Sequence, residues 1–423
     1  MRLFPAKPPP GPFRPGFFRS PLRGPWLTSL LGSLLLVAMF LVSITGLLSH
    51  AAYQPDLGAN AIVPTGADAP WLNIGWPTHP SWLYALTQGT HVTLGIIAVP
   101  LLLAKLWSVI PRLFAWPPVA SPAQALERLS LLALVGGALF QFATGIVNAQ
   151  VYYPFKFGFV TAHYYGAWVF MSALVIHVLV KLPTIRRAYR ERGVLKPLRE
   201  SLEQTRPEPY DPDGLVSERP AEPTLSRRGL LGVVGAMTAG LFVVTAGQSI
   251  GGPLRRTALL APRGRVRGNG PNDFEVNKTA ATAKITPKMT GDGYRLKVQG
   301  RKTVELSRAQ LLALPQHTEH LPIACVEGWS TTQAWTGVRL RDLAVLAGMP
   351  ASTQLHVGSL QEAGALRQAT LESGQVADER SLLALKVNGA DLSPDHGYPA
   401  RVIVPALPGV HCTKWVATLD FRA

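Results

Sequence analysis

The 423-residue chain has only two cysteines and few charged residues. So few cysteines exclude a small scaffold held together by several disulfides. Charged residues make up 16% of the chain and hydrophobic residues 47%, whereas soluble domains are about 25% charged. This composition excludes a wholly soluble protein and a disordered one, because so much apolar surface must be buried in a core or in lipid. The length suits two or three domains.

Acidic residues are scarce as well. The chain has 25 Asp and Glu against 41 Lys and Arg, which leaves a formal net charge of +16. In a soluble protein such an excess suggests binding to nucleic acid. Here the basic residues gather beside long uncharged segments, as they do in the cytoplasmic loops of membrane proteins. We therefore interpret the charge as a topology signal and predict no nucleic-acid partner.

Long uncharged runs indicate membrane spans. Residues 26–48 contain no charged residue, and about 20 apolar residues in a helix cross the roughly 30 Å hydrocarbon layer. Three further runs lie at about 83–104, 129–149 and 162–180. Together they predict an all-α four-helix membrane bundle over residues 26–183, surrounded by membrane lipid. A weaker, Gly-rich apolar run at 230–247 is a candidate fifth span.

The positions of Lys and Arg predict the orientation. The N-terminal tail 1–25 is basic and has no acidic residue, whereas residues 49–82 contain no Lys or Arg. Lys105, Arg112 and Arg128 are assigned to the loop between the second and third runs. The segment 184–225 starts with many basic residues and continues as a polar, Pro-rich linker. We predict a multi-pass protein of the inner or plasma membrane, with its N-terminus and this linker in the cytoplasm.

The segment 226–250 begins with Ser226-Arg227-Arg228 and continues into the weak apolar run. This order resembles a twin-arginine export signal, placed internally, of the kind used for domains that fold around a cofactor before export. The alternative is an ordinary membrane anchor with flanking arginines. We expect the domain that follows to be extracytoplasmic. The opposing signal, which keeps a cytoplasmic placement open, comes from basic residues in the linker 251–269: Arg255, Arg256, Arg263, Arg265 and Arg267.

Four histidines lie in or beside the runs: His50, His91, His163 and His177. His163 and His177 are 14 residues apart. In a helix this spacing gives a net rotation of about 320° and a rise of about 21 Å, so the two histidines share one helix face near opposite membrane surfaces. A b-type haem (heme b) needs two axial imidazoles at similar depth on facing helices. We predict a haem between His91 and His163 on the outer side. Pairing of His50 with His163 and of His91 with His177 stays open, as does an interfacial role without haem.

On these histidines, residues 26–183 resemble the integral cytochrome b subunits of formate dehydrogenases and hydrogenases. In that family, paired histidines on the fourth helix serve two haems. The inner haem takes a further ligand near the cytoplasmic end of the first helix, whereas His50 is at the opposite end here. We predict that the bundle exchanges electrons with the quinone and quinol pool.

From about residue 270 the pattern changes to short alternating segments with turn signals, which indicates an α+β domain over 270–423. Ser307 and Gln310 predict a capping box at the start of a short helix. The other expected elements are strands at 293–300, 321–328, 401–407 and 414–421 and an amphipathic helix at 335–349. About 155 residues are enough for a separate hydrophobic core.

Cys325 stands at the end of a predicted strand, before Val-Glu-Gly-Trp-Ser and the pattern W-x-G-V-x-L-x-D-L that starts at Trp335. These motifs resemble the molybdopterin domain of the sulfite oxidase superfamily, and the residues after the cysteine are similar to its methionine-sulfoxide reductase branch. The resemblance implies molybdopterin as the cofactor and the Cys325 thiolate as the protein ligand of molybdenum, a role that suits a soft ligand.

The closing motif of that family, G-x-P-x-R-x-x-x-P followed by a K-W strand, is matched at Gly397, Pro399, Arg401, Pro405, Lys414 and Trp415. By this match, Arg401 faces the metal pocket and Lys414 holds the cofactor phosphate. Asn277-Lys278 resembles the Asn-His step beside the pterin, with Lys in place of His. The other residues of the expected cofactor loops are Glu327, Trp329, Ser330, His411 and Thr413. From the residues alone, a disulfide between Cys325 and Cys412 is an alternative.

These patterns predict a membrane oxidoreductase that passes electrons between the quinone pool, a haem and an outward-facing molybdenum centre. We expect it to remove oxygen from a small or protein-borne oxidised substrate such as a sulfoxide. One alternative is the reverse reaction on a sulfite-like anion, although the Asn-Arg-Arg that follows the cysteine of sulfite oxidases is absent here. Another alternative is a non-catalytic membrane redox sensor with a degenerate domain.

Overall fold

The computed structural model describes all residues except 1–4, 6, 15, 54–74, 120, 210–213, 265–267, 352 and 423. Arg2, Arg265, Arg267 and part of the loop 49–82 therefore lie outside the described residues. The chain divides into two compact units. The helical unit comprises Met1–Ser43, Leu94–Val147 and Ala162–Phe242, and the mixed unit comprises Ile44–Thr93, Asn148–Thr161 and Val243–Ala423.

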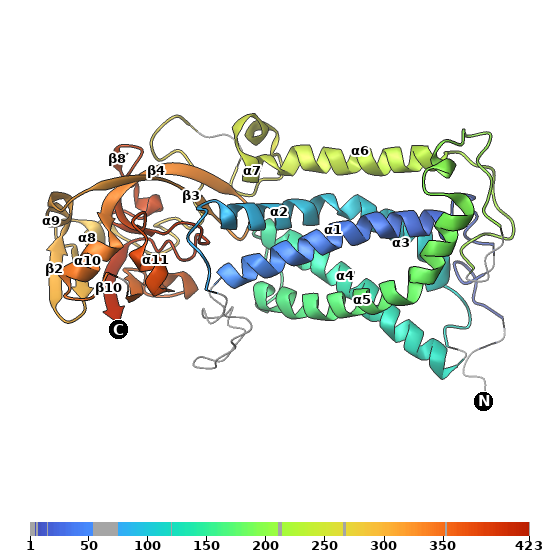
Figure 1. Ribbon diagram of the computed structural model, residues 1–423, viewed down its shortest axis with the longest axis horizontal. Coiled ribbons are helices and arrows are strands. Elements are labelled where there is room, and N and C mark those ends of the chain that lie inside the picture. Colours follow the sequence, from blue (N-terminus) through green and yellow to red (C-terminus); the bar gives the residue numbers. More distant parts are fainter. Residues whose placement is uncertain are drawn as a thin grey trace. The chain divides into compact units, whose positions relative to one another are not determined.

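Apolar helices make up most of the first part of the chain (Figure 1). Their bounds are α1 Pro25–Ala52, α2 Leu83–Ile97, α3 Val99–Leu113, α4 Pro122–Ala149, α5 Phe159–Arg192 and α6 Arg227–Thr245. Among the described residues, four helices are long and apolar enough to cross a membrane, and α2 with α3 makes a fifth candidate. Their positions agree with the runs predicted from the sequence, including the weak run at 230–247.

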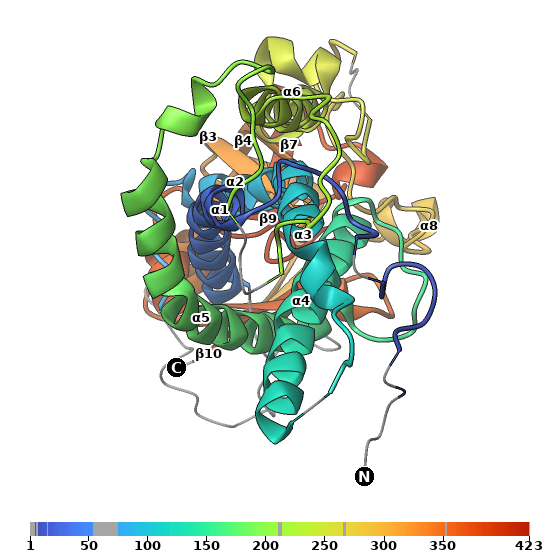
Figure 2. The same cartoon turned by 90° about the vertical axis from the view of Figure 1, so that its right-hand side faces the viewer.

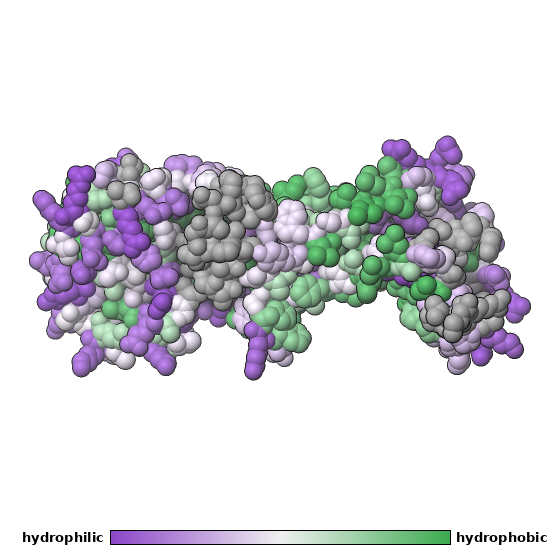
Figure 3. All heavy atoms as spheres, turned by 90° about the horizontal axis from the view of Figure 1, so that it is seen from below, coloured by the Kyte–Doolittle hydropathy of each residue, from purple (hydrophilic) through white to green (hydrophobic). Residues whose placement is uncertain are grey.

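The surface of these helices is hydrophobic. Figure 3 shows a belt of hydrophobic residues over the helical part of the chain. Large apolar side chains are exposed along several of these helices, among them Val37, Phe40, Leu132, Leu179 and Val233. Soluble surfaces rarely carry so much contiguous apolar area, whereas lipid-facing helices do. The helices are therefore compatible with a membrane.

Inside the helical unit, small and large apolar residues interlock. One buried cluster takes a residue from each of four helices, which Figure 2 shows nearly end-on: Met39 of α1, Leu102 of α3, Ala138 of α4 and Phe170 of α5. Gly137 lets α4 approach α5, because a Cβ on it would lie 3.3 Å from Phe170 Cβ. Close backbone approach at small residues is the usual way that membrane helices associate.

The second predicted run is not one straight helix, and its basic end is not a loop. The axis bends by 41° between α2 and α3, where Pro100 in the first turn of α3 has no N–H to continue the ladder of α2. Lys105 and Arg112, which the sequence analysis assigned to a loop, lie within α3. The Lys105 ammonium group is accommodated within the bundle because its Nζ donates to Thr28 O of α1 at 2.8 Å.

The C-terminal part of the mixed unit contains two β-sheets. The strands are β1 Arg295–Gln299, β2 Thr303–Ser307, β3 His317–Ala324, β4 Ser330–Arg339, β5 Gln354–Ser359, β6 Gln368–Leu371, β7 Leu382–Val387, β8 Ala390–Asp391, β9 Arg401–Ile403 and β10 Val416–Arg422. The first sheet has the order β2-β1-β10-β5-β6, in which β1 and β10 are parallel. The second has the order β3-β4-β7-β8, with β9 also paired to β7.

The remaining helical elements are short. They are α7 Gly247–Ile250, α8 Pro287–Thr290, α9 Arg308–Ala313, α10 Leu340–Leu346 and α11 Ser373–Ala377, with 3₁₀ turns η2 Lys196–Leu198, η3 Gly252–Thr257, η4 Ala365–Arg367 and η5 Pro394–His396. The predicted capping box is confirmed: Ser307 Oγ accepts from Gln310 N, and Gln310 Oε1 accepts from Ser307 N.

The predicted helix over 335–349 is wrong in its first third. Trp335 to Arg339 belong to β4, and α10 begins only at Leu340. β4 is paired on both sides, with β3 and with β7, and this pairing outweighs the local helical pattern. Gly337 passes so close to Leu383 O of β7 that no side chain would fit there.

β7 separates two hydrophobic cores. Leu383 and Leu385 belong to the larger core, together with residues of β1, β5 and β10, whereas Leu382 and Ala384 belong to a smaller core that contains Cys325. Successive side chains of a strand point to opposite faces, so an unbroken apolar strand can serve two cores. The second core is the part of the fold that positions the candidate site.

A buried carboxylate secures the turn that enters β7. Asp378 accepts hydrogen bonds from Arg380 through Nε at 3.0 Å, Nη2 at 2.8 Å and the backbone N–H at 2.9 Å. Burial raises the pKa of Asp378, but the hydrogen bonds from Arg380 and Thr78 lower it by more. The pKa of Asp378 therefore lies below its ordinary value.

We expect Asp378→Asn to destabilise the full chain by about 1–3 kcal/mol near neutral pH, since it removes a charge-assisted hydrogen-bond acceptor from a buried site. A carboxylate with a depressed pKa stabilises the fold above its unfolded pKa of about 3.9 and loses that contribution as the pH falls through its folded pKa. The difference in Tm between wild type and variant, measured in detergent, should therefore shrink below about pH 4. The exposed substitution Glu305→Gln is the control, and a pH-independent difference at Asp378 would contradict the argument.

Candidate functional site

Cys325 directly follows β3 and opens a tight loop that leads into β4. Its N–H donates to Trp329 O at 3.0 Å, and the Gly328 N–H donates to Cys325 O at 3.0 Å. Gly328 has a φ of +90°, a conformation that glycine adopts without a steric penalty. The loop turns the chain from β3 into antiparallel β4 and leaves Cys325 buried at its base.

The Cys325 thiol is protonated in the absence of a cation. Burial raises the pKa of this thiol to about 12, and the negative charge of Glu327 adds to the effect. Metal ligation requires the thiolate, so a soft metal ion would displace the proton. Cys412 is also a buried free thiol. The alternative of a Cys325–Cys412 disulfide is therefore wrong.

Arg401, at the start of β9, brings a buried positive charge to the same core. Its guanidinium lies 5.6 Å from the centre of the Trp335 ring, and Trp335 shares the smaller core with Cys325 and Cys412. Nε and Nη1 donate to Cys412 O and His396 O, both at 3.3 Å. Burial lowers the pKa of Arg401 to about 10. Within the described part of the chain, no carboxylate forms an ion pair with it.

Lys414 adds a second buried cation. Its Nζ donates to two backbone carbonyls, Lys278 O at 2.8 Å and Asp395 O at 2.7 Å. Burial, reinforced by the positive charge of Arg401, holds the pKa of Lys414 well below its usual range. The Asp395 carboxylate and the Trp415 ring also interact with Lys414. Two buried cations that repel each other are stabilised further by an anion placed between or beside them.

The loop before Lys414 contains a polar atom with no partner in the described structure. The Thr413 side chain is buried, and its Oγ1 makes no hydrogen bond to any described residue. Buried hydroxyls are nearly always bonded, so this one marks a place for a polar ligand. His411 is buried nearby, and burial lowers its pKa to about 4, which leaves it neutral at physiological pH.

These groups fit a molybdenum-bound pterin with a phosphate. Cys325 offers a thiol for the metal, while Arg401 and Lys414 offer buried positive charge and Thr413 offers a hydroxyl. The Asn277-Lys278 step belongs to the same place, because Lys278 O accepts the bond from Lys414 Nζ. Asn277 Oδ1 accepts from Lys278 N at 2.9 Å and so shapes the turn.

Glu327, Trp329 and Ser330 serve the loop itself. Glu327 accepts from Trp329 Nε1 at 2.7 Å and forms a two-pronged ion pair with Arg263, with distances of 2.6 and 3.0 Å. Ser330 Oγ donates to Ser249 O at 2.8 Å. Both carboxylate oxygens of Glu327 are therefore occupied by protein groups. Sequence reasoning missed Arg263 as a member of this site, because it treated that residue only as a topology charge.

Two arginines that opposed an outside location are neutralised within the mixed unit. Arg263 is paired with Glu327, and Arg255 is paired with the buried Glu275. Arg256 is exposed. Because folding cancels the charges of Arg255 and Arg263, they oppose translocation of a folded domain less than free arginines would.

The four histidines lie on helices. In the mixed unit, His50 is in the last turn of α1, and His91 of α2 packs against α1 at Gly46, where a Cβ would lie 2.7 Å from the imidazole Cε1. In the helical unit, His163 and His177 are both on α5 and both half-buried. Gly145 of α4 faces His163, since a Cβ there would lie 3.4 Å from Cε1.

A hydroxyl of α4 contacts the His163 ring. Thr144 Oγ1 lies 2.8 Å from His163 Nδ1 and 2.7 Å from Phe140 O. Either Thr144 or the imidazole is the donor in the first contact, depending on the tautomer of the ring. Metal-ligating histidines commonly have their second nitrogen held by a neighbouring polar group.

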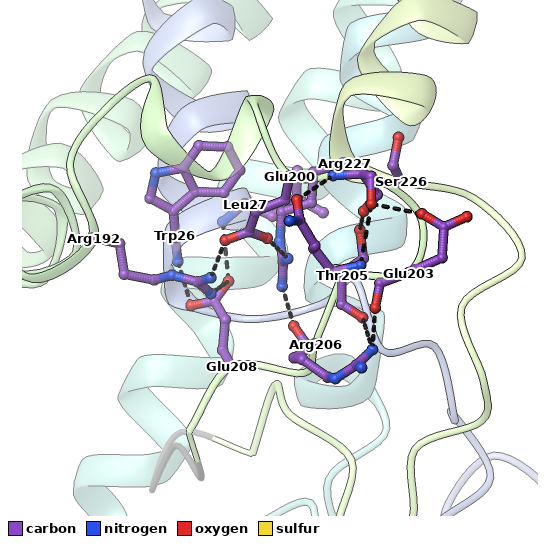
Figure 4. Close-up of polar contacts among 12 residues, drawn as sticks. Trp26, Leu27, Arg192, Glu200, Glu203, Thr205, Arg206, Glu208, Ser226 and Arg227 are labelled. Atoms are coloured by element: carbon purple, nitrogen blue, oxygen red, sulfur yellow. Dashed lines mark hydrogen bonds and ion pairs between the residues drawn. The ribbon is translucent and has the colours of Figure 1, made fainter.

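Arg227, the first arginine of the predicted export motif, is fully buried in the helical unit, whereas Arg228 is exposed. Figure 4 shows that Arg227 donates to Glu200 Oε2 at 2.9 Å and to Arg206 O at 2.8 Å. Arg192 pairs with Glu200 at 3.3 Å and also with Glu208 at 3.9 Å. This network joins the start of α6 to the end of α5 through the linker.

The same network reaches α1. Glu208 accepts from Trp26 N at 3.0 Å and from Leu27 N at 3.5 Å, and Figure 4 shows its carboxylate at the first turn of the helix. A negative charge at this end stabilises a helix and satisfies N–H groups that have no partner within it. Gly24 leaves the room for it, because a Cβ there would collide with the Glu208 side chain.

Comparison with known proteins shows which family the C-terminal region matches. Residues 283–423 match the family of the oxidoreductase molybdopterin binding domain. Over 160 residues the chain is 31% identical to sulfite oxidase of Gallus gallus, and over 117 residues it is 32% identical to the uncharacterized oxidoreductase YuiH of Bacillus subtilis. The crystal structure of the sulfane dehydrogenase SoxCD from Paracoccus pantotrophus is 25% identical, with a TM-score of 0.29, and covers 31% of this chain and 38% of that chain.

These similarities concern part of each protein. The matches cover 31% of this chain and 35% of the Gallus protein, and 27% of this chain and 58% of the Bacillus protein. The C-terminal region is thus a sulfite oxidase-like molybdopterin-binding domain of an oxidoreductase. The family match begins after Asn277 and Lys278, which the sequence analysis had included in the domain.

We expect Arg227→Lys to lower the Tm of the detergent-solubilised chain, by about 1–3 kcal/mol in stability, because Lys cannot bridge Glu200 and Arg206 O as a guanidinium does. Arg228→Lys, at the exposed neighbour, is the matched control and should leave Tm unchanged. Glu200→Gln should destabilise in the same direction as Arg227→Lys. Equal effects at Arg227 and Arg228 would show that burial of the first arginine has no structural role.

Proposed function

We propose that this chain is a membrane-bound molybdopterin-dependent oxidoreductase that exchanges electrons between the quinone pool, a b-type haem and an extracytoplasmic molybdenum centre. The observation that carries the proposal is the buried group of Arg401, Lys414 and Thr413 in a domain where Cys325 offers a metal ligand. Buried cations whose hydrogen-bond acceptors are backbone carbonyls are costly unless an anion accompanies them. The phosphate of a molybdopterin meets that need.

When bound, the molybdenum and its pterin supply oxygen-atom transfer coupled to a two-electron change. Cys325 would hold the metal, and Lys414, itself held by two carbonyls, would bind the phosphate. Arg401 would orient the substrate oxygen, because its guanidinium is fixed by two carbonyls and by the Trp335 ring. Overall, reduction of a sulfoxide would break the sulfur–oxygen bond and release water, with two electrons from the quinol and two protons from solvent.

The loop after Cys325 favours a neutral oxidised substrate such as a sulfoxide, small or protein-borne. The loop lacks the Asn-Arg-Arg that helps bind an anion after the cysteine of sulfite oxidases. The nearby Arg263 is paired with Glu327 and does not replace it. A loop without that arginine pair suits a neutral thioether oxide better than an anion.

Oxidation of a sulfite-like anion is the second candidate, and the similarity to a sulfite oxidase favours it. Electrons would then flow from molybdenum to the quinone. The two reactions are separated by two steady-state assays on one preparation: methionine sulfoxide with a quinol analogue, and sulfite with a quinone analogue.

The haem part of the proposal rests on His163, whose Nδ1 lies 2.8 Å from Thr144 Oγ1. A ligating histidine commonly has its second nitrogen held by a neighbouring polar group, so Nε2 would be the atom that binds iron. His91 is the partner that we propose, with His50 and His177 as the ligands of the alternative pairing. Gly46 and Gly145 have no side chain, so the imidazoles of His91 and His163 can lie directly against α1 and α4 respectively.

We propose a cytoplasmic N-terminus and an extracytoplasmic C-terminal domain. Pairing of Arg255 and Arg263 with buried carboxylates reduces the charge that opposed this arrangement. A twin-arginine signal belongs to the same proposal. Export machinery would bind Arg227 before the network with Glu200 forms, and the network would then fix α6 to the other helices.

We expect correctly matured protein to contain about one molybdenum per chain, since one thiol ligand serves one metal. Cys325→Ser should lower oxygen-transfer activity by at least about tenfold, a barrier increase of about 1.4 kcal/mol, because the soft ligand is lost. Cys412→Ser is the matched control and should retain both metal and activity. Elemental analysis that finds no molybdenum in matured wild-type protein would refute the proposal.

We expect His163→Leu to abolish the haem absorbance while the molybdenum content stays unchanged. Thr144→Val, which removes the partner of Nδ1, should weaken haem binding by about tenfold. Ser130→Ala on α4 is the matched control, because Ser130 also donates to a carbonyl one turn back but is exposed. An unaltered haem spectrum in His163→Leu would exclude this histidine as a ligand.

A further inference from the structure

We propose that the loop Val326–Gly328 is the electron-transfer contact between the metal at Cys325 and a haem at His91, and that Gln88 and Gly328 are the positioning residues of that contact. The inference rests on the proposed function, because it needs both redox groups. It goes further in naming the path and the residues that hold it.

Three successive carbonyls of the loop are held by two helices. Gln88 Nε2 of α2 donates to Val326 O at 2.5 Å. Gln248 Nε2 and Ser249 Oγ, both of α7, donate to Glu327 O at 3.5 Å and to Gly328 O at 2.5 Å. Backbone carbonyls of a loop usually bond to water or to the loop itself. Here side chains of neighbouring helices replace water, so the loop has a defined position on α2.

The approach between the loop and α2 depends on glycine. A Cβ on Gly328 would lie 2.7 Å from Val92 Cβ and 2.9 Å from Val92 Cγ1. A Cβ on Gly89, one turn earlier in α2, would lie 3.1 Å from Ser249 Cβ and 3.8 Å from Gly328 O. Backbone therefore packs on backbone and on short side chains, without a large residue between.

His91 borders the same face of α2. Gln88 and Val92 are four residues apart and lie together on one face, and His91 is adjacent to Val92 and three residues from Gln88. The imidazole is wedged against Gly46 of α1. Cys325, the loop and one turn of α2 thus form a continuous covalent and hydrogen-bonded path to His91. Electron transfer falls steeply with distance, so a path of this kind determines its rate.

The segment before α2 keeps this alignment. Trp76 Nε1 donates to Ala406 O at 2.7 Å, and Ala406 N donates to Ser81 O at 3.1 Å. Tyr84, in the first turn of α2, is buried in the larger core of the domain. These contacts anchor the start of the helix to the domain, so the loop and His91 are held by the same rigid element.

The test is Gly328→Ala in the full-length protein with both redox groups bound. The added methyl meets Val92, and the loop must lift from α2. We expect substrate-driven oxidation of the reduced haem, followed by stopped-flow absorbance, to slow by at least about tenfold, or about 1.4 kcal/mol in barrier. In the second variant, Gln88→Leu, which leaves the loop sequence unchanged, substrate reduction driven by a reduced viologen dye, which delivers electrons directly to the metal, should stay within about twofold of wild type, which is below about 0.5 kcal/mol.

Gly389→Ala is the matched control. Gly389 also has a positive φ, of +82°, but a Cβ there would meet nothing within 4 Å. It therefore has the same backbone strain without a neighbour to displace. Gln88→Leu is the second variant, because it keeps the side-chain size, removes the donor to Val326 O and adds no strain. Hydrogen exchange of residues 325–330 should increase in Gly328→Ala and Gln88→Leu and not in Gly389→Ala, also in protein without cofactors.

The outcomes distinguish a failure of the proposed function from a failure of the proposed electron-transfer contact. Wild-type protein without haem or molybdenum would refute the proposed function. If wild type contains both and transfers electrons, unaltered haem oxidation in Gly328→Ala and Gln88→Leu would refute this contact alone. Equal losses of Gln88→Leu in the haem and dye assays would also refute it, because they would place the effect at the metal itself.

Discussion

Buried positive charge that hydrogen-bonds to backbone carbonyls is the constraint on which the C-terminal domain depends. Arg401 and Lys414 lie in the interior, interact with each other, and donate only to backbone carbonyls. Desolvated charges of this kind cost several kcal/mol each unless they are compensated. The fold accepts this cost because a bound anion removes it, so cofactor binding and domain stability are linked. Thr413, with its unbonded hydroxyl, belongs to the same incomplete site.

The thiol chemistry follows from the same environment. The low polarity that makes Arg401 costly also keeps the Cys325 thiol protonated, so ligation by this residue requires the metal to arrive with enough positive charge to displace a proton. Two groups would hold opposite ends of the cofactor: Lys414 would pair with the anionic phosphate, and the Cys325 thiolate with the cationic metal. Groups of opposite charge at the two ends would fix the orientation of the bound cofactor.

Local pattern was sufficient for most elements. The end of β3 at Cys325 and the capping box at Ser307 follow from short-range signals, and long uncharged runs locate α1 and α6. The predictions are wrong where long-range contacts decide the structure. Trp335 is in a strand because β3 and β7 pair with it from both sides, and the ammonium group of Lys105, inside α3, donates a hydrogen bond to Thr28 O, 77 residues away. No window of sequence contains those partners.

Charged residues were the least reliable guide from sequence to structure, because the effect of an arginine depends on whether it is paired with a carboxylate. Arg227, Arg255 and Arg263 counted equally with free arginines in the sequence, yet the structure pairs them with Glu200, Glu275 and Glu327 respectively. A rule based on basic residues describes charges that meet the membrane unpaired during insertion. For a domain that folds before export, the relevant quantity is the charge that remains unpaired after folding. Because Arg255 and Arg263 are paired, the segment after α6 opposes export of the domain less than its number of arginines suggests. The same pairing gives Arg263 a second role, since the charge it neutralises belongs to the loop that carries Cys325.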